Sequence, residues 1–417
     1  MSALDHVAEQ KYMIASSAGL VNPLWPYFSL EEPRLVLDVR SDSAFHQAHL
    51  ANSYHIYPIA ELKSRYSYLP PRNVPFLVIA DQDQRHQVAE AFASTPAARL
   101  IYLLEATPTS SFQSTKVDRE AFFASAQQCG LLRTSGSHQD RITATHSDDI
   151  PNLLFRPSPA VQRTVLNLES SHSTAHTLRV LDLGCGAARD LAWILHASRS
   201  RTSPCSWIGV GVDNWKAALS RAQLLMEDLC LTSEERKPRC ESMLWAKCSD
   251  AGYLDPLVGS GKGKSVLSPK DDAELWQRHV ALGLEALLPV STAQSQESED
   301  VRERGFDLIL SIRFHPHSLL RRLSSLVRTS GIVLLSHFVT LSPTERSIAA
   351  EAHPEAILDY ESPPHEGRIQ PGEVEALVER WNKLVEAGCK WVVAEEVLEP
   401  IEDRRIIKSV ALRKVAM

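Results

Sequence analysis

The sequence predicts an α/β protein with two domains in a chain of 417 residues. Three observations carry this prediction. Apolar, strand-like runs alternate with helically spaced segments before residue 106, and they do so again after residue 151. A polar stretch at 107–150, which begins with a run rich in Ser and Thr and contains one predicted helix at 118–130, separates the two segments. In the second segment, a strand-like run leads directly into a glycine turn and then a helix.

The composition argues against several classes of protein. The net charge of −7, from 51 acidic and 44 basic residues, leaves no overall positive excess to hold phosphate backbones. Seven cysteines without a C-x-x-C pair fit neither a disulfide framework nor a zinc site, so we expect a reducing compartment and no metal. The N-terminus lacks the apolar core of a secretory signal, and no run reaches the ~20 apolar residues of a membrane helix. We expect a soluble cytoplasmic protein, with an organellar address as the alternative.

The N-terminal segment reads as short parallel strands joined by helices. Strand-like runs lie at 35–40, 75–80 and 99–104, and helical spacing occurs at 45–49 and 87–92. This order resembles a single rhodanese domain covering residues 15–106. The resemblance rests on a strand at 37–40, a strand at 76–80, and the residues Phe45, His49, Ala51, Pro58 and Arg85.

In the rhodanese family, a six-residue loop opens with a cysteine that accepts sulfur. Backbone N–H groups of such a loop stabilise thiolate charge. The matching loop here, 80–85, opens with Ala80, and Asp81 and Asp83 add negative charge to it. A methyl side chain cannot carry sulfur, and residues 1–128 contain no cysteine. We therefore predict a non-catalytic domain for docking or stability; a pocket for another anion or a protein partner is the alternative.

The C-terminal segment opens with a strand at 178–183, followed by Gly184, Cys185 and Gly186 and a helix at 187–196. Glycines allow a sharp turn and a close approach of a ligand, and the helix N-terminus offers unpaired N–H groups. The third glycine of the dinucleotide pattern G-x-G-x-x-G is replaced by Arg189, which disfavours an NAD site.

The next strand, 207–212, ends at Asp213. A carboxylate at the tip of the second strand can accept hydrogen bonds from both hydroxyls of a ribose. Asp213 can also serve as the N-cap of a helix at 215–229, and the two uses are compatible.

Together, V-L-D-L-G-C-G-A-A-R-D at 180–190 and V-G-V-D-N at 210–214 resemble the first two motifs of class I S-adenosylmethionine-dependent methyltransferases. The resemblance implies a Rossmann-like domain at 151–417 that binds S-adenosyl-L-methionine. It also implies the cofactor-binding residues. These are Asp182, Gly184 and Gly186 at the methionine and ribose, Asp213 at the ribose and Asp250 near the adenine amino group, together with Cys185, Asn214 and Ser311. For Asp250, an ordinary turn residue is the alternative.

The fourth strand, 306–311, is followed by Arg313, His315 and His317. The carboxyl end of such a strand faces the crevice where substrate meets cofactor. A histidine there can act as a base if the acceptor must lose a proton, and the arginine can hold an anionic acceptor. The alternative is a turn shaped by proline, with solvated histidines.

This half of the domain resembles the tellurite-resistance branch of the methyltransferases, which has an R-Y-L-H-R-P-L-like run after strand four and a P-G-E-L-like segment near the end. His315-Pro-His317 departs from that run, so the resemblance implies no particular substrate.

The sequence thus predicts methyl transfer from S-adenosyl-L-methionine to a small molecule or an RNA base. A catalytically degenerate, cofactor-binding interaction module is the first alternative. A sulfurtransferase is the second, and Ala80 at the nucleophile position opposes it.

Overall fold

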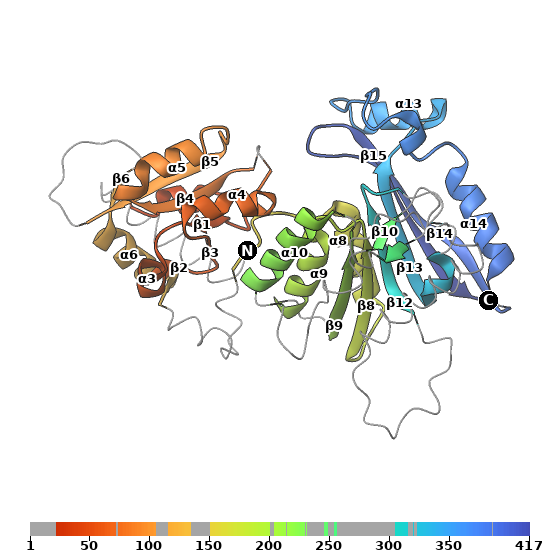
Figure 1. Cartoon of the computed structure of the whole chain (residues 1–417), viewed down its shortest axis with the longest axis horizontal. Helices are drawn as coiled ribbons and strands as arrows, with labels where there is room; N and C mark the ends of the chain where they lie inside the picture. The colour runs from red at the N-terminus through yellow and green to blue at the C-terminus, as the bar shows by residue number, and fades with distance from the viewer. Residues whose placement is uncertain are drawn as a thin grey trace, which may run out of the picture. The chain divides into compact units, whose positions relative to one another are not determined.

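The computed structural model describes most of the chain, and contacts divide it into two compact units, Met1–Arg156 (unit 1) and Pro157–Met417 (unit 2) (Figure 1). The described residues are 22–71, 74–105, 116–134, 151–200, 204–213, 215–229, 231, 246–248, 254–256, 305–315, 320, 323–385 and 387–417. Both units contain helices and largely parallel sheets, which confirms the predicted α/β class.

Unit 1 is built on a parallel sheet with the strand order β3-β1-β4-β5-β6. Its strands are β1 (Val36–Asp38), β3 (Tyr54–His55), β4 (Phe76–Asp81), β5 (Ala98–Leu104) and β6 (Lys116–Asp118). The central strand β4 is buried from Phe76 to Ala80, because helices cover both faces of the sheet. A separate antiparallel pair joins β2 (His49–Leu50) to β7 (Leu132–Arg133).

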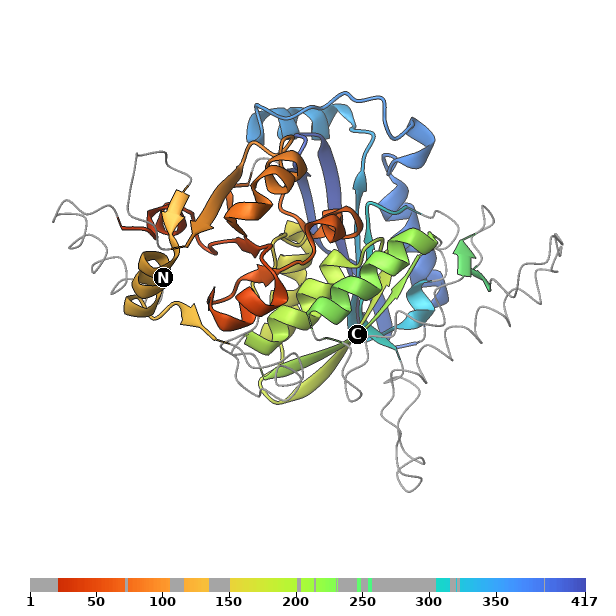
Figure 2. The same cartoon turned by 60° about the vertical axis from the view of Figure 1, so that its left-hand side comes forward.

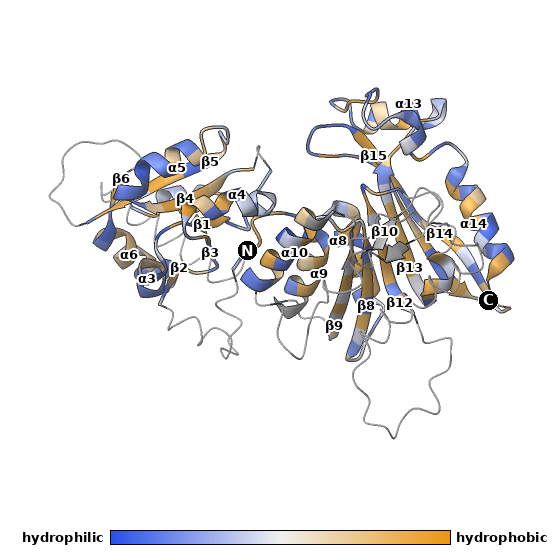
Figure 3. Ribbon diagram, in the orientation of Figure 1, coloured by the Kyte–Doolittle hydropathy of each residue, from blue (hydrophilic) through white to orange (hydrophobic). Residues whose placement is uncertain are grey.

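The helices of unit 1 supply the apolar faces that the sheet requires. They are α2 (Trp25–Phe28), α3 (Asp42–Gln47), α4 (Leu62–Arg65), α5 (Arg85–Ala91) and α6 (Arg119–Gln128), with single 3₁₀ turns at η1 (Ile59–Glu61), η2 (Tyr66–Tyr68) and η3 (Gln82–Gln84). Helices α5 and α6 lie on opposite faces of the sheet (Figure 1). On the α6 face, Phe122 and Ala126 pack with Leu77 and Ile79 of β4. The strands are the most apolar part of the unit (Figure 3).

The end of unit 1 differs from the sequence prediction, which placed a linker at 107–150. Helix α6 confirms the helix predicted at 118–130, but the flanking residues form the strands β6 and β7, and β6 pairs with β5. The apolar positions of this segment are few and are flanked by polar runs, so its sequence resembles a linker although it completes the sheet.

Unit 2 contains a six-stranded sheet with the order β14-β15-β13-β12-β8-β9. The strands are β8 (His176–Leu183), β9 (Cys205–Val212), β12 (Phe306–Ile312), β13 (Val327–Phe338), β14 (Cys389–Pro400) and β15 (Ile406–Ala416). Strands β9, β8, β12 and β13 are parallel, and β15 is antiparallel to both its neighbours. Two further strands, β10 (Ala246–Cys248) and β11 (Leu254–Pro256), pair with each other.

The strand order places a topological switch point between β8 and β12. The chain leaves β8 toward β9 on one side and later returns to β12 on the other. Ligands of open α/β sheets bind at the carboxyl ends of the strands at such a point.

Helices cover both faces of this sheet. They are α8 (Pro159–Ser170), α9 (Arg189–Ser200), α10 (Lys216–Asp228), α13 (Pro343–Ala352) and α14 (Glu373–Leu384), with 3₁₀ turns at η6 (Leu323–Leu326) and η7 (His365–Gly367). Helices α8, α9 and α10 lie on one face and α14 on the other (Figures 1 and 2). Leu181 and Leu183 of β8 belong to the core cluster that contains Trp381 of α14. Because side chains alternate along a strand, Asp182 faces the other side.

Two glycines of β9 allow α9 to pack closely against the sheet. A Cβ atom on Gly209 would lie 2.3 Å from Cδ1 of Leu191, and one on Gly211 would lie 2.9 Å from Sγ of Cys185. Gly209 therefore serves the packing of α9, and Gly211 mainly makes room for Cys185 in the bend after β8. Within the described residues, no helix is long and apolar enough to cross a membrane, and no group of three metal-binding side chains occurs.

Candidate functional site

The bend after β8 is formed by residues with left-handed backbone. Gly184 has φ of +66°, Gly186 of +56° and Ala188 of +55°. The N–H of Cys185 donates to the carbonyl of Val212 at 3.0 Å, which joins the bend to the end of β9. Glycine adopts this conformation without the steric cost that another residue incurs, so the two glycines make the tight bend possible.

The carboxylate of Asp213, after the end of β9, also holds the bend in place. One carboxylate oxygen accepts the N–H of Gly186 at 2.8 Å, and the other accepts the N–H of Trp215 at 2.8 Å. Trp215 is the N-cap residue of α10. Asp213 therefore links the glycine bend to the start of that helix, and each of its oxygens keeps a further lone pair for another donor.

The space over the two glycines differs. Among the described residues, a Cβ atom on Gly186 would meet no atom within 4 Å, whereas one on Gly184 would lie 2.4 Å from Cγ of Phe314. Phe314 follows β12, across the switch point from β8. The ring of Phe314 thus occupies the space beside Gly184, and the bend is open at Gly186.

Three carboxylates surround the bend. Asp182 is 3% exposed, and no hydrogen bond from the described residues reaches its carboxylate. Burial, and then the nearby charges of Asp190 and Asp213, raise the pKa of Asp182 well above its usual value. Burial also raises the pKa of Asp190, although this carboxylate accepts the N–H of Ser158 at 2.8 Å. The site therefore favours a positive charge near Asp182.

Cys185 and Ser311 were both predicted to bind cofactor. In the structure, the N–H of Cys185 and the hydroxyl of Ser311 donate hydrogen bonds to backbone carbonyls of the protein. The N–H of Cys185 is bonded to β9, and the side chain lies against Gly211. Ser311 is fully buried, and its hydroxyl donates to the carbonyl of Phe314 at 2.6 Å. These two residues shape the walls of the site.

Arg313 lies in the turn that follows β12 and has a left-handed φ of +56°. Its N–H donates to the carbonyl of Ser336 at 2.6 Å, and its guanidinium donates to Glu402 at 2.6 Å. The side chain of Arg313 is 48% exposed. Arg313 therefore holds the turn against β13 and against the connection between β14 and β15.

His315 is buried, in contrast to the solvated turn that the sequence left as an alternative. Its side chain is 3% exposed, and Nε2 lies 3.0 Å from Oε1 of Glu373, the first residue of α14. The imidazole stacks on that of His337 in β13, with ring centres 5.5 Å apart and an interplanar angle of 16°. A histidine, a second histidine and a carboxylate thus meet at the carboxyl edge of the sheet.

The structure does not place all of the predicted site residues, and it adds others. Asn214, Asp250 and His317 lie outside the described residues. Sequence reasoning missed Asp190, Phe314, His337, Glu373 and Glu402. Only Glu373 had a local signal, because it follows the Pro371-Gly372 pair that starts α14; the others join the site only through the fold.

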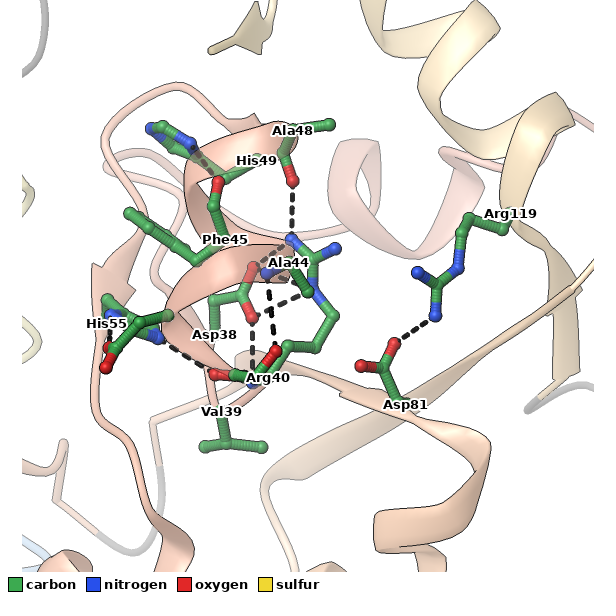
Figure 4. Close-up of polar contacts among 12 residues, drawn as sticks. Asp38, Val39, Arg40, Ala44, Phe45, Ala48, His49, His55, Asp81 and Arg119 are labelled. Atoms are coloured by element: carbon green, nitrogen blue, oxygen red, sulfur yellow. Dashed lines mark hydrogen bonds and ion pairs between the residues drawn. The ribbon is translucent and has the colours of Figure 1, made fainter. Parts of the chain in front are cut away.

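In unit 1, side-chain contacts hold the loop after β4, and Figure 4 shows one of them, between Asp81 and Arg119. Ala80 is fully buried in β4, and Asp81 forms an ion pair with Arg119 of α6. The N–H of Asp81 donates to Oε1 of Gln84 at 3.0 Å, and Nε2 of Gln84 donates to the carbonyl of Val39 at 2.8 Å. Burial raises the pKa of Asp81, and the charge of Arg119 opposes that shift.

To the left of Asp81 in Figure 4, a buried ion pair and an aromatic stack hold neighbouring segments of unit 1. Nη2 of Arg40 lies 2.6 Å from Oδ2 of Asp38, and both side chains are buried. The ring of Phe45 stacks between those of His49 and His55, at centroid distances of 4.0 and 4.2 Å. These contacts account for the polar residues of the segment as parts of the fold.

Comparison with known proteins gives distant similarities. No family model matches the chain. The chain is 27% identical over 380 residues to the uncharacterized protein UNK4.09 of Schizosaccharomyces pombe, which covers 91% of this chain and 93% of that protein. Because the aligned length exceeds that of unit 2, the similarity extends into unit 1.

Solved structures resemble the chain only remotely. A SAM-dependent methyltransferase from Aquifex aeolicus is 13% identical, with a TM-score of 0.30 over 61% of this chain and 88% of that one. Magnesium protoporphyrin IX methyltransferase from Synechocystis PCC 6803, with bound SAM, is 10% identical, with a TM-score of 0.30 over 61% and 77%. The [4+2]-cyclase SpnF is 8% identical, with a TM-score of 0.32 over 61% and 81%. These similarities are too distant to assign an activity to this chain.

The buried carboxyl of Asp182 makes the stability of unit 2 depend on pH. Its folded-state pKa lies above the unfolded value of 3.8, so its contribution to stability is complete below that pH and is lost as the pH rises through the folded pKa. Asp182→Asn removes this loss. We expect the variant to melt at a higher temperature than the wild type near about pH 7.5, and at nearly the same temperature near about pH 4.

Glu345→Gln is the control of opposite sign in this thermal unfolding series. Burial opposes ionisation of Glu345, but the bond from Lys408 dominates together with contacts from Ser342, and the pKa is lowered. The substitution should therefore destabilise near neutral pH and have less effect in acid. Equal melting temperatures of the wild type and Asp182→Asn at every pH would contradict the account of Asp182.

Proposed function

We propose that unit 2 binds S-adenosyl-L-methionine and transfers its methyl group to a small molecule or an RNA base. The observation that carries the proposal is the buried carboxylate of Asp182 beside a glycine bend that is open at Gly186. The cofactor carries a sulfonium and an ammonium, and either positive charge stabilises a carboxylate that has no hydrogen-bond donor among the described residues.

The charges of the site favour this cofactor over a dinucleotide. A pyrophosphate at the bend would be repelled by the charge of Asp213, and the raised pKa values of Asp182 and Asp190, caused mainly by burial, show that the site disfavours further negative charge. A nucleoside that carries a cation avoids this repulsion. Asp213 remains the proposed ribose ligand, because its two oxygens can each accept a second hydrogen bond besides those from Gly186 and Trp215.

Phe314 limits where the ligand lies. Its ring fills the space beside Gly184, so we assign the close approach of the ligand to Gly186. A sulfonium placed between the open side of Gly186 and the ring of Phe314 would gain a cation–π contact. The methyl group would then point toward the turn that carries Arg313 and His315.

The catalytic roles follow from the chemistry of methyl transfer. The reaction needs an aligned nucleophile, and proximity supplies much of the rate. We propose Arg313 for holding an anionic part of the acceptor and His315 as the base. For His317, Asn214 and Asp250 the proposal rests on the sequence resemblance alone.

A cofactor-binding module without transfer is the second candidate. The observation that favours it is the ring of Phe314 against Gly184, because a permanently filled position would keep the methionine part of the cofactor away from the bend. In that case the chain would bind a nucleoside and act through a partner.

For unit 1, we propose a rhodanese-like domain without sulfurtransferase activity that serves docking or stability. Ala80 offers no nucleophile, and the loop that follows is tied by the Asp81–Arg119 pair and by Gln84. A protein partner on this domain remains part of the proposal, as does a cytoplasmic location for the chain.

Calorimetric titration tests cofactor binding. We expect S-adenosyl-L-methionine to bind the wild type with roughly micromolar affinity and Asp182→Asn to weaken it about tenfold, which is ~1.4 kcal/mol, because the amide has the shape of the carboxylate without its charge. Asp359→Asn, which changes an exposed carboxylate of the same unit, should leave the affinity unchanged. Absence of heat for the wild type would remove the proposal.

An assay of sulfur transfer from thiosulfate to cyanide tests the proposal for unit 1. We expect no turnover by the wild type. Ala80→Cys should also remain inactive, because position 80 is buried in β4 and the loop is held by its own side chains. Turnover by the wild type would show that another residue carries sulfur.

A further inference from the structure

Arg313, directly after β12, combines a strained backbone with a half-exposed side chain. Its φ of +56° lies in the left-handed region, which a residue other than glycine adopts only at an energetic cost. The hydrogen bond from its N–H to the carbonyl of Ser336 in β13 holds that conformation. Strained residues of this kind gather at functional sites, which makes the guanidinium of Arg313 a candidate ligand-binding group.

The guanidinium of Arg313 is used only in part within the described residues. Nη2 donates to Oε2 of Glu402 at 2.6 Å, and neither Nε nor Nη1 makes a hydrogen bond to a described residue. Glu402 lies in the connection between β14 and β15, and its side chain is 47% exposed. An arginine can hold a carboxylate through two parallel bonds, whereas this pair has one. Because exposed ion pairs contribute little to stability, a ligand can displace Glu402 at small cost.

The turn that carries Arg313 passes beside the bend after β8. A Cβ atom on Gly184 would lie 2.7 Å from Cβ of Phe314, the next residue of the turn, so the two segments lie side by side. Gly186, the open position of the bend, follows closely along the chain. The guanidinium of Arg313 therefore stands on a turn that borders the proposed cofactor site.

The charges of Arg313 and Glu402 also reach the first turn of α9, which follows the bend. Burial, the largest effect, raises the pKa of Asp190 in that turn. The N–H of Ser158 and then the charges of Arg189 and Arg313 lower this pKa, whereas the charge of Glu402 raises it. Because such effects weaken with distance, the pair of Arg313 and Glu402 lies near the start of α9.

The partners of Arg313 belong to the half of the sheet away from the proposed cofactor residues. Gly186 and Asp213 follow β8 and β9, whereas Ser336 lies in β13 and Glu402 between β14 and β15. In the order β14-β15-β13-β12-β8-β9, the two groups stand on opposite sides of the switch point. This arrangement favours the acceptor, rather than the cofactor, as the ligand of Arg313.

We propose that the methyl acceptor carries a carboxylate for recognition, which Arg313 binds in place of Glu402, and that Glu402 is a specificity-determining residue. This inference rests on the proposed function of unit 2. In the ligand-free chain, Glu402 takes the position of the acceptor's carboxylate, because the two groups have the same atoms and charge. The acceptor gains two parallel bonds to the guanidinium, and Glu402 turns to solvent. A neutral acceptor cannot displace Glu402, so the ion pair selects against it.

The first test identifies the class of the acceptor. The wild type is incubated with methyl-labelled S-adenosyl-L-methionine and, in parallel, with a fractionated metabolite extract or with RNA. We expect label in metabolites that an anion exchanger retains near neutral pH and that mass spectrometry shows to contain a carboxyl group. Label confined to products without a carboxyl group, such as a neutral metabolite or an RNA base, would overturn the inference.

The second test uses the acceptor identified in this way. Arg313→Met should raise the KM for that acceptor about tenfold or more, because the thioether cannot bind a carboxylate. Glu402→Gln should lower the same KM about threefold, because the competing charge is gone. A gain of this kind cannot come from a damaged fold. Arg346→Met and Asp359→Asn are matched controls, since they break an exposed ion pair of the same length, 2.6 Å, and should leave the KM unchanged.

Calorimetry of the same variants separates the acceptor from the cofactor. We expect Arg313→Met to bind S-adenosyl-L-methionine as tightly as the wild type does. A loss of cofactor affinity in this variant would assign the guanidinium to the carboxylate of S-adenosyl-L-methionine and overturn the inference. An unchanged KM in Glu402→Gln would remove the role of Glu402.

The two proposals fail in different ways. If calorimetry shows no cofactor binding by the wild type, the proposed function of unit 2 fails. If the cofactor binds and the labelled acceptor carries no carboxyl group, only the roles of Arg313 and Glu402 in recognition fail.

Discussion

The geometry of the candidate site depends on one interaction, the carboxylate of Asp213 holding the glycine bend to the start of α10. Its two oxygens accept N–H groups from Gly186 and Trp215, which belong to different segments. Two backbone bonds also hold the left-handed residues after β8, one from the N–H of Cys185 to the carbonyl of Val212 in β9 and one from the N–H of Ala188 to the carbonyl of Cys185. Asp213 thereby fixes the open space over Gly186 and brings a second negative charge toward Asp182.

In this arrangement the carboxyl group of Asp182 is buried, which makes its ionised form unfavourable. Asp182 faces α9, away from the apolar cluster that contains Leu181 and Leu183, and its nearest charges are other acids. Strained or uncompensated groups of this kind persist where function requires them. On this account the free energy lost to the buried charge is recovered when a cation binds, which makes the site selective for charge as well as for shape.

Much of the fold was predictable from local sequence signals. The apolar runs at β4, β8, β9 and β12 are continuous because both faces of each strand are covered, and this pattern separates them from helices. In the segment at 116–134 the helix was predicted, but the strands β6 and β7 were not, because core residues such as Phe122 lie within a polar composition. Its place in unit 1 follows from pairing with β5, which is a long-range contact that local patterns do not encode.

The candidate site was predictable in part for the same reason. Asp182, the glycines and Asp213 lie directly at strand ends, so their positions follow from the strand assignments. The hydrogen bonds of Ser311 and Cys185 could not be predicted from the strand assignments. Their partners, the carbonyls of Phe314 and Val212, lie in the turn after β12 and in β9. Phe314 and His337 joined the site only through the order of strands in the sheet.

The central claim is that a cation in the bound cofactor ionises Asp182. Calorimetry in two buffers of different ionisation enthalpy, at several values between about pH 5 and pH 8, measures the protons released on binding. The account predicts that S-adenosyl-L-methionine displaces a proton from the wild type in the range where Asp182 titrates, and none in that range from Asp182→Asn. Equal proton release from the two proteins would contradict it.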